Sequence, residues 1–110
     1  MSWRGKKVLV TGGNGFLGKY LVDKLIEKQA QTIVFRSVDC DLRNRNETLE
    51  FFRHASPDIV IHSAVQGGGI GWMKSHPVES GLDNVRININ ALEASFAAGA
   101  SSVQIPSTSP

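Results

Sequence analysis

Short apolar runs alternate with longer amphipathic segments along this chain. Four runs have the length and the aliphatic content of strands buried in a parallel sheet: Lys7–Thr11, Thr32–Phe35, Asp58–His62 and Ser102–Ile105. Segments with helical periodicity separate these runs. Because strands and helices alternate, the pattern predicts an α/β fold.

The first two intervals have the pattern of amphipathic helices. Phe16–Lys28 carries a stripe of leucines, with its charged residues on the other sides. A shorter helix is expected before the third run, with Leu49 and Phe52 turned inward. Asn44 and Asn46 are both suitable N-caps for it, and the pattern does not choose between them.

The last helix is predicted to be the longest. It begins near Pro77, because proline suits the first helical position, and it ends near Ala98, because Gly99 is a suitable stop. Four apolar residues spaced four, three and four apart give this helix its apolar stripe: Val85, Ile89, Leu92 and Phe96.

Composition narrows the classes of function. The chain has 110 residues, a formal net charge of +2 and 41% hydrophobic residues, which is ordinary for a soluble globular protein. Its basic residues are scattered and its apolar runs are short, so we expect no nucleic-acid or membrane partner. Cys40 is the only cysteine and the histidines lack ligand spacing, so we expect no metal site. We expect a cytoplasmic protein.

The stretch Thr11–Gly18 joins the first strand to the first helix and is rich in glycine. Gly13, Gly15 and Gly18 fit G-x-G-x-x-G, and Gly12 with the last two fits G-x-x-G-x-x-G. Such glycines allow a sharp turn, close approach of a pyrophosphate, and tight packing of helix on strand. The N–H groups at the helix start then bind the phosphates. The stretch predicts a dinucleotide site; the alternative is a turn that only packs a helix on a strand.

The order of elements agrees with that prediction, because alternating strands and helices build a Rossmann-type parallel sheet with helices on both faces. A complete dinucleotide fold needs two β-α-β-α-β halves. Residues 1–110 supply one half and the opening of the second. We interpret 1–110 as the N-terminal part of an NAD(P)-binding Rossmann domain, truncated after about four strands, with the rest of the sheet and the substrate domain absent.

The end of the second strand discriminates between cofactors. An NAD site places a carboxylate there to bind the ribose 2′-hydroxyl, about twenty residues after the glycine turn. This chain has Arg36 at that place, and its first carboxylate is Asp39. A guanidinium suits a 2′-phosphate, so we predict NADP rather than NAD. In the alternative, Arg36 is a solvated strand end and Asp39 or Asp41 binds the ribose.

Four stretches together resemble the extended short-chain dehydrogenase/reductase family, also called the NAD-dependent epimerase/dehydratase family: Thr11–Gly18, Asp41-Leu42, Ala64-Val65 and Asp83-Asn84. Within this family, three stretches are similar to a subfamily of nucleotide-sugar epimerase/reductases: Gly68-Gly69-Ile70-Gly71, His76-Pro77 and the helix at 83–90. The family resemblance covers nearly the whole chain.

The resemblance implies a cofactor-binding role for several positions. The pyrophosphate would lie on the glycine turn, formed by Gly12, Gly13, Asn14, Gly15, Phe16, Leu17 and Gly18. Arg36 would bind the adenosine 2′-phosphate, and Asp41 and Leu42 would flank the adenine. The backbone that would pass beneath the cofactor belongs to Ser63, Ala64 and Val65.

The resemblance also implies a substrate side. Gly68, Gly69 and Ile70 would border the nicotinamide and the sugar, although their composition alone also fits a plain connector. Asn84 would brace the active site; without the resemblance it is a helix-surface residue.

The family's catalytic Ser or Thr falls on Thr108, or on Ser107 if the register is off by one. Its hydroxyl would bind the keto oxygen of the substrate during hydride transfer. Pro110 stands where the subfamily has a cysteine linked to epimerisation. Proline cannot transfer a proton, and this departure counts against epimerisation.

Tyr20 and Lys24 have the Tyr-x-x-x-Lys spacing of the family's catalytic pair, but they lie on the first helix, just past the glycine turn. The mechanism needs its tyrosine at the nicotinamide end of the cofactor, so we interpret these two as helix-surface residues. Tyr20 is the only tyrosine. The catalytic pair is therefore absent from this chain.

Three functions are compatible with these observations. The first is the NADP-binding part of an oxidoreductase that delivers hydride to a C4 ketone of a nucleotide sugar. The second is a nucleotide- or partner-binding remnant without turnover. The third is part of a UDP- or dTDP-sugar epimerase or dehydratase. Arg36 and the Gly68–Gly71 stretch favour the first over the third. A homodimer is the expected assembly, because uncovered apolar helices promote self-association.

Overall fold

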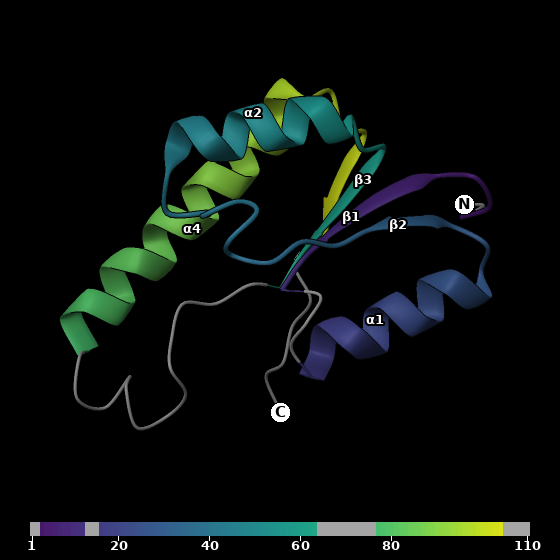
Figure 1. Ribbon diagram of the computed structural model, residues 1–110, viewed down its shortest axis with the longest axis horizontal. Coiled ribbons are helices and arrows are strands. Elements are labelled where there is room, and N and C mark those ends of the chain that lie inside the picture. Colours follow the sequence, from purple (N-terminus) through teal and green to yellow (C-terminus); the bar gives the residue numbers. More distant parts are fainter. Residues whose placement is uncertain (1–2, 13–15, 64–76, 105–110) are drawn as a thin grey trace.

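The computed structural model describes residues 3–12, 16–63 and 77–104. Its centre is a parallel sheet of four strands in the order β2-β1-β3-β4, which confirms the predicted Rossmann-type sheet (Figure 1). The strands are β1 (Lys7–Thr11), β2 (Gln31–Ile33), β3 (Ile59–His62) and β4 (Ser102–Gln104). All neighbouring strands pair in parallel.

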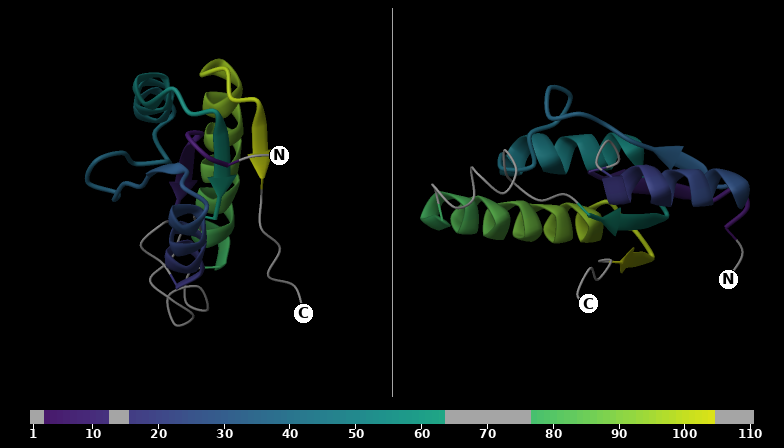
Figure 2. Two further views of the ribbon diagram at one scale, coloured as in Figure 1. Left: turned by 90° about the vertical axis from the view of Figure 1, so that its right-hand side faces the viewer. Right: turned by 90° about the horizontal axis from the view of Figure 1, so that it is seen from below.

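Helices cover both faces of the sheet, as predicted (Figure 2). They are α1 (Phe16–Glu27), α2 (Arg45–Ala55) and α4 (Pro77–Ala97). α1 packs on one face, whereas α2 and α4 pack together on the other. None of these described helices is both long enough and apolar enough to span a membrane.

The core has two parts because side chains of a strand alternate between the faces of a sheet. Val8 and Val10 of β1 contribute to the cluster beneath α1, together with Leu25 of that helix. Leu9 faces the other way, into the cluster beneath α2 and α4. The central strand β1 is therefore apolar on both faces, as expected for a buried parallel strand.

The second strand is shorter than the sequence pattern predicts. Residues 31–33 pair with β1, but Val34 and Phe35 have left the sheet. Phe35 is 9% exposed, and its ring packs against Phe51 of α2 at a centroid distance of 4.6 Å. Since an edge strand pairs on one side only, another sheet residue adds little here, whereas burial of an aromatic ring adds more.

The structure decides the cap of α2. The Asn44 side chain accepts a hydrogen bond from the N–H of Glu47 over 3.0 Å, so Asn44 is the N-cap and Asn46 lies within the helix. At the other end Ser56 has a left-handed conformation, with φ 49°, and its N–H donates to the carbonyl of Phe52. Phe52 is fully buried, as predicted.

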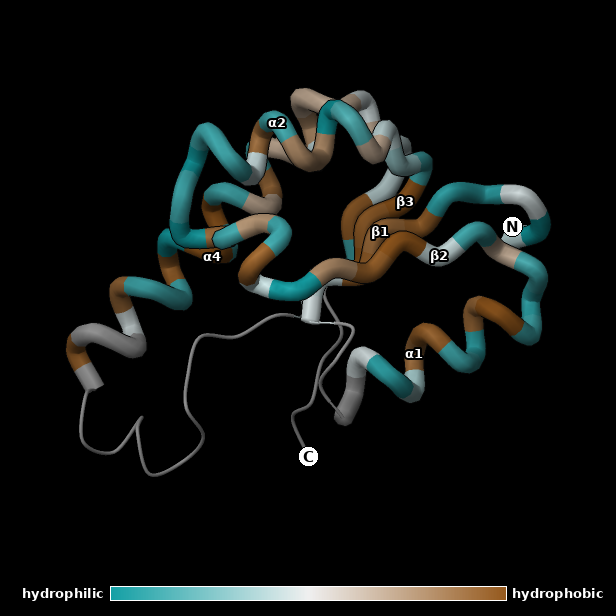
Figure 3. The backbone as a smooth tube through the Cα atoms, viewed as in Figure 1, coloured by the Kyte–Doolittle hydropathy of each residue, from teal (hydrophilic) through white to brown (hydrophobic). Residues whose placement is uncertain are grey.

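The apolar stripe predicted for the last helix is not the face that packs. The side chains of Val85, Ile89, Leu92 and Phe96 are 43–88% exposed. α4 instead packs through Ile87, Ala91 and Ala94, each no more than 5% exposed. Small alanines let the helix approach α2 and the sheet closely, and this decides the orientation. Figure 3 shows hydrophobic positions along α4 as well as in the central strands.

Candidate nucleotide site

The candidate site lies at the carboxyl ends of β1 and β3, the edge where open α/β sheets bind ligands. Thr11 and His62 are partners in register at these ends. The N–H of Ser63 donates to the hydroxyl oxygen of Thr11 over 2.9 Å, and the Ser63 hydroxyl donates to the Thr11 carbonyl. The start of the glycine turn and the segment after β3 are thus held side by side.

The glycine turn lies between β1 and α1, which are the predicted strand and helix. Gly12 has a φ of +71°, a left-handed conformation that glycine adopts without steric cost. Gly18 is buried in the first helical turn of α1. This turn carries no acidic side chain, so the positive end of the helix dipole is not neutralised locally. Gly13, Asn14 and Gly15 lie outside the described residues, as do the side chains of Phe16 and Leu17.

Arg36 lies three residues beyond the end of β2 and is exposed. Its own backbone N–H donates to the Asp39 carboxylate over 3.1 Å, and its carbonyl accepts from the Asp39 N–H over 2.9 Å. Among the described residues, the guanidinium of Arg36 forms no ion pair within 4.0 Å. The predicted contact of this guanidinium with a 2′-phosphate stays a prediction.

The two carboxylates that could instead bind a ribose already have partners. Asp39 closes the turn at Arg36. Asp41 accepts the Nε and Nη2 hydrogens of Arg43, both over 3.1 Å, and the Arg43 backbone N–H over 3.0 Å. These hydrogen bonds from Arg43 hold the pKa of Asp41 below its usual value.

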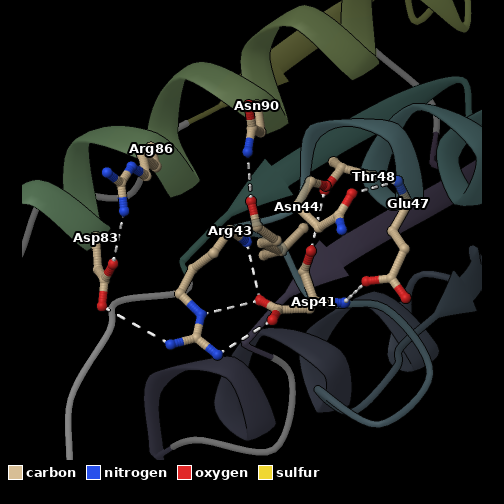
Figure 4. A network of polar contacts seen from close by, with 9 residues as sticks. Asp41, Arg43, Asn44, Glu47, Thr48, Asp83, Arg86 and Asn90 are labelled. Atoms are coloured by element: carbon tan, nitrogen blue, oxygen red, sulfur yellow. Dashed lines mark hydrogen bonds and ion pairs between the residues drawn. The ribbon is translucent and has the colours of Figure 1, made fainter.

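Arg43 also connects the loop before α2 to α4. Its Nη1 lies 3.8 Å from Asp83 Oδ2, and Arg86 Nη1 lies 3.6 Å from the other oxygen of Asp83 (Figure 4). These side chains, with Asp41 and Asn44, line a polar hollow of about 330 Å³. Alternating charges of both signs make this a surface that can accept a polar group on the predicted adenine side.

Leu42 lies in the core, whereas Asn84 is only half-buried. Leu42 is 8% exposed and belongs to the core beneath α2 and α4, and its carbonyl accepts from the Asn90 amide over 2.8 Å. Asn84 lies half-buried on α4, next to Asp83. The predicted contacts of Leu42 with adenine and of Asn84 with the active site stay predictions.

Tyr20 and Lys24 lie on the surface of α1. Tyr20 is 57% exposed, and the Lys24 ammonium nitrogen lies 5.5 Å from the centre of its ring. Their predicted assignment to the helix surface is confirmed. Cys40 is buried, and burial raises the pKa of its thiol to about 11, so it stays protonated at neutral pH.

Several predicted site residues lie outside the described residues: Ala64, Val65, Gly68, Gly69, Ile70, Ser107 and Thr108. Conversely, sequence reasoning missed Arg43 and His62. Arg43 follows Asp41 by two residues, a spacing at which their side chains can meet in a turn. His62 ends a strand directly before a predicted site segment, and that position was the available signal.

Comparison with known proteins identifies the family. Residues 8–110 match the NAD dependent epimerase/dehydratase family. The chain belongs to this family. The GDP-L-fucose synthase of Azorhizobium caulinodans is 36% identical over 93 residues, which are 84% of this chain and 30% of that protein. The GDP-L-colitose synthase of Yersinia pseudotuberculosis is 31% identical over 88 residues, which are 80% of this chain and 29% of that protein.

A solved structure shows the same fold. The GDP-L-fucose synthetase of Naegleria fowleri, bound to NADP, aligns with a TM-score of 0.76 and 29% identity. The alignment covers 91% of this chain and 30% of that one. The chain therefore spans about 30% of the length of these relatives. The expected family and the similarity to nucleotide-sugar epimerase/reductases are confirmed.

Proposed function

We propose that this chain is the N-terminal, NADP-binding part of a nucleotide-sugar reductase similar to GDP-L-fucose synthase. The reaction would deliver hydride from NADPH to a C4 ketone of the sugar. The family match and the GDP-sugar relatives support this class of reaction. The substrate side would be supplied by Gly68–Ile70 and by the hydroxyl of Thr108, or of Ser107.

The observation that carries the cofactor assignment is the exposed guanidinium of Arg36, three residues beyond β2. It has no ion pair among the described residues, whereas Asp39 and Asp41 already have partners. Asp41 already accepts three hydrogen bonds from Arg43, which leaves it fewer lone pairs for a ribose hydroxyl. A 2′-phosphate at this position gains charge-assisted hydrogen bonds instead. NADP is thus favoured over NAD.

Fluorescence titration tests this assignment. We expect the chain to bind NADPH at least about tenfold more tightly than NADH, because a hydrogen bond to a charged group contributes about 1.5–3 kcal/mol. Arg36→Asp should abolish the preference. Arg53→Gln is the matched control, because Arg53 lies in the last turn of α2, which leads to the opposite end of the sheet. Equal binding of the two cofactors by the wild type would contradict the assignment.

Catalysis requires more than these residues supply. The general acid would be a tyrosine near the nicotinamide, and the only tyrosine here is the exposed Tyr20 on α1. We therefore expect the purified 110-residue chain to reduce no 4-keto nucleotide sugar. The assay follows NADPH absorbance with a GDP-linked 4-keto sugar. Any turnover would support a different acid and contradict this expectation.

A second copy of this chain is the partner that we propose for α4. The outer face of α4 consists of Val78, Leu82, Val85, Ile89, Leu92 and Phe96, all exposed. Their spacing of four, three, four, three and four is that of a seam between packed helices. A two-fold axis would place two such seams against each other.

The non-catalytic remnant and the UDP- or dTDP-sugar enzyme remain the alternative functions. In the first alternative, the 110 residues act as they stand and bind a nucleotide or a partner without turnover. In the second alternative, the substrate is a UDP- or dTDP-sugar. Competition for the nucleotide-sugar site tests it, because a UDP- or dTDP-sugar would then compete and a GDP-sugar would not. The GDP-sugar relatives favour the first proposal.

A further inference from the structure

A buried chain of hydrogen bonds crosses the carboxyl edge of the sheet. His62, the last residue of β3, is 3% exposed. Its Nδ1 lies 2.7 Å from the hydroxyl oxygen of Thr11, and its Nε2 lies 2.7 Å from Oδ1 of Asn88 on α4. One imidazole ring thus ties together β1, β3 and α4.

The partners determine which ring nitrogen carries the proton. Asn88 Oδ1 can only accept, so Nε2 donates to it, and the neutral ring leaves Nδ1 to accept from the Thr11 hydroxyl. The same hydroxyl oxygen accepts the N–H of Ser63 over 2.9 Å. Burial lowers the pKa of His62, which favours the neutral ring that this arrangement needs.

The residues at both ends of this hydrogen-bond network lie near predicted site residues. Thr11 immediately precedes Gly12, the first residue of the glycine turn, and Ser63 is the first residue after β3. Asn88 lies about one helical turn beyond Asn84 on α4. His62 and Thr11 are the buried members of this network, and each is held in place because a lost hydrogen bond would leave a buried polar group without a partner.

We propose that His62 is a positioning residue of the nucleotide site. Through Thr11 and Ser63 it sets the spacing between the start of the glycine turn and the segment after β3, so that both can contact the same cofactor. Asn88 fixes the orientation of the ring. The role of His62 rests on the proposed function, since it requires this edge of the sheet to bind NADP.

Paired substitutions separate the two sides of the ring. Thr11→Val removes the hydroxyl with little change of shape, whereas Thr11→Ser keeps it. His62→Asn keeps an acceptor near the position of Nδ1, whereas His62→Gln keeps a donor near that of Nε2. We expect Thr11→Val and His62→Gln to weaken NADPH binding about tenfold, the size of one lost buried hydrogen bond. Thr11→Ser and His62→Asn should stay within about threefold of the wild type.

Asn88→Ala tests the role without disturbing a buried residue, because Asn88 is exposed on α4. It should weaken NADPH binding about threefold, since the ring then loses one of its two restraints. Asn46→Ala is the matched control, because Asn46 is an exposed helical asparagine on α2. Nitrogen NMR of the imidazole should show the proton on Nε2 in the wild type.

Two results would overturn the role of His62 alone: unchanged NADPH affinity in both Thr11→Val and Asn88→Ala, or equal losses in Thr11→Ser and Thr11→Val. Absence of NADPH binding by the folded wild type would overturn the proposed function, and the positioning role with it. A proton on Nδ1 would contradict the assigned direction of both hydrogen bonds of the ring.

Discussion

The two faces of α4 reverse the usual relation between hydrophobicity and burial. The inner face is small or polar at most positions and no more than 7% exposed: Ile87, Asn90, Ala91, Ala94 and Ser95. The outer face carries six large apolar side chains that are at least 43% exposed. Closeness of approach decides which face packs, since small residues admit α2 and the sheet. The two buried polar side chains bond to backbone carbonyls of Leu42 and Ala91.

The largest effect is expected from a matched pair of isoleucines on this helix. Ile87 is 5% exposed and Ile89 is 57% exposed. Ile87→Ala should lower the free energy of unfolding by about 2–5 kcal/mol, because it leaves a cavity beneath the helix. Ile89→Ala should cost less than about 1 kcal/mol. Urea denaturation measures both values, and equal losses would mean that both faces are covered in solution.

A smaller effect on the free energy of unfolding is expected from the protonation of His62, the histidine that bonds to Asn88 of α4. Because burial lowers the pKa of His62 in the fold, the unfolded chain binds a proton more readily below its ordinary value of 6.5. The free energy of unfolding should therefore fall as pH falls below 6.5, with a slope of at most about 1.4 kcal/mol per pH unit from this group.

The comparison that isolates this slope is wild type against His62→Asn across pH 5 to 8, a range of about three units around the histidine value. The other two histidines are the same in both proteins, so only the residue at position 62 differs between them. A slope that is the same in both proteins would show that His62 does not supply it.

The smallest effect on stability is expected at the outer face, together with a change in assembly. Ile89→Gln combined with Phe96→Gln should change the free energy of unfolding of the monomer by no more than about 1 kcal/mol, because both side chains are mostly exposed. The same double variant should shift sedimentation towards the monomer. If the wild type already sediments as a monomer at high concentration, the outer face does not pair two copies.

Much of the fold follows from local patterns. The apolar runs located β1 and β3 because a strand buried on both faces leaves an unmistakable aliphatic signal. The glycine turn between β1 and α1 was identifiable because its spacing reflects a backbone requirement, and Gly12 does adopt a left-handed conformation. Arg36 could be predicted as a 2′-phosphate ligand because it lies about twenty residues beyond that turn.

The hydrogen-bond and ion-pair partners of the polar side chains were harder to predict from the sequence. Thr11, His62 and Asn88 lie far apart in sequence and meet only because parallel pairing aligns the ends of β1 and β3 beneath α4. Nothing local in the chain marks such a network. The same holds for Asp83, which Arg43 reaches across from the loop before α2.

Local patterns were enough to predict the order of the elements, the parallel α/β class and the position of the glycine turn, because these depend on periodicity and on backbone conformation. Contacts in the folded molecule were needed to show that β2 ends at Ile33, that Asn44 caps α2, and that α4 turns its alanines inward. Each of those outcomes depends on a choice among competing contacts. These contacts join segments that are far apart in the sequence, so a local pattern does not predict them.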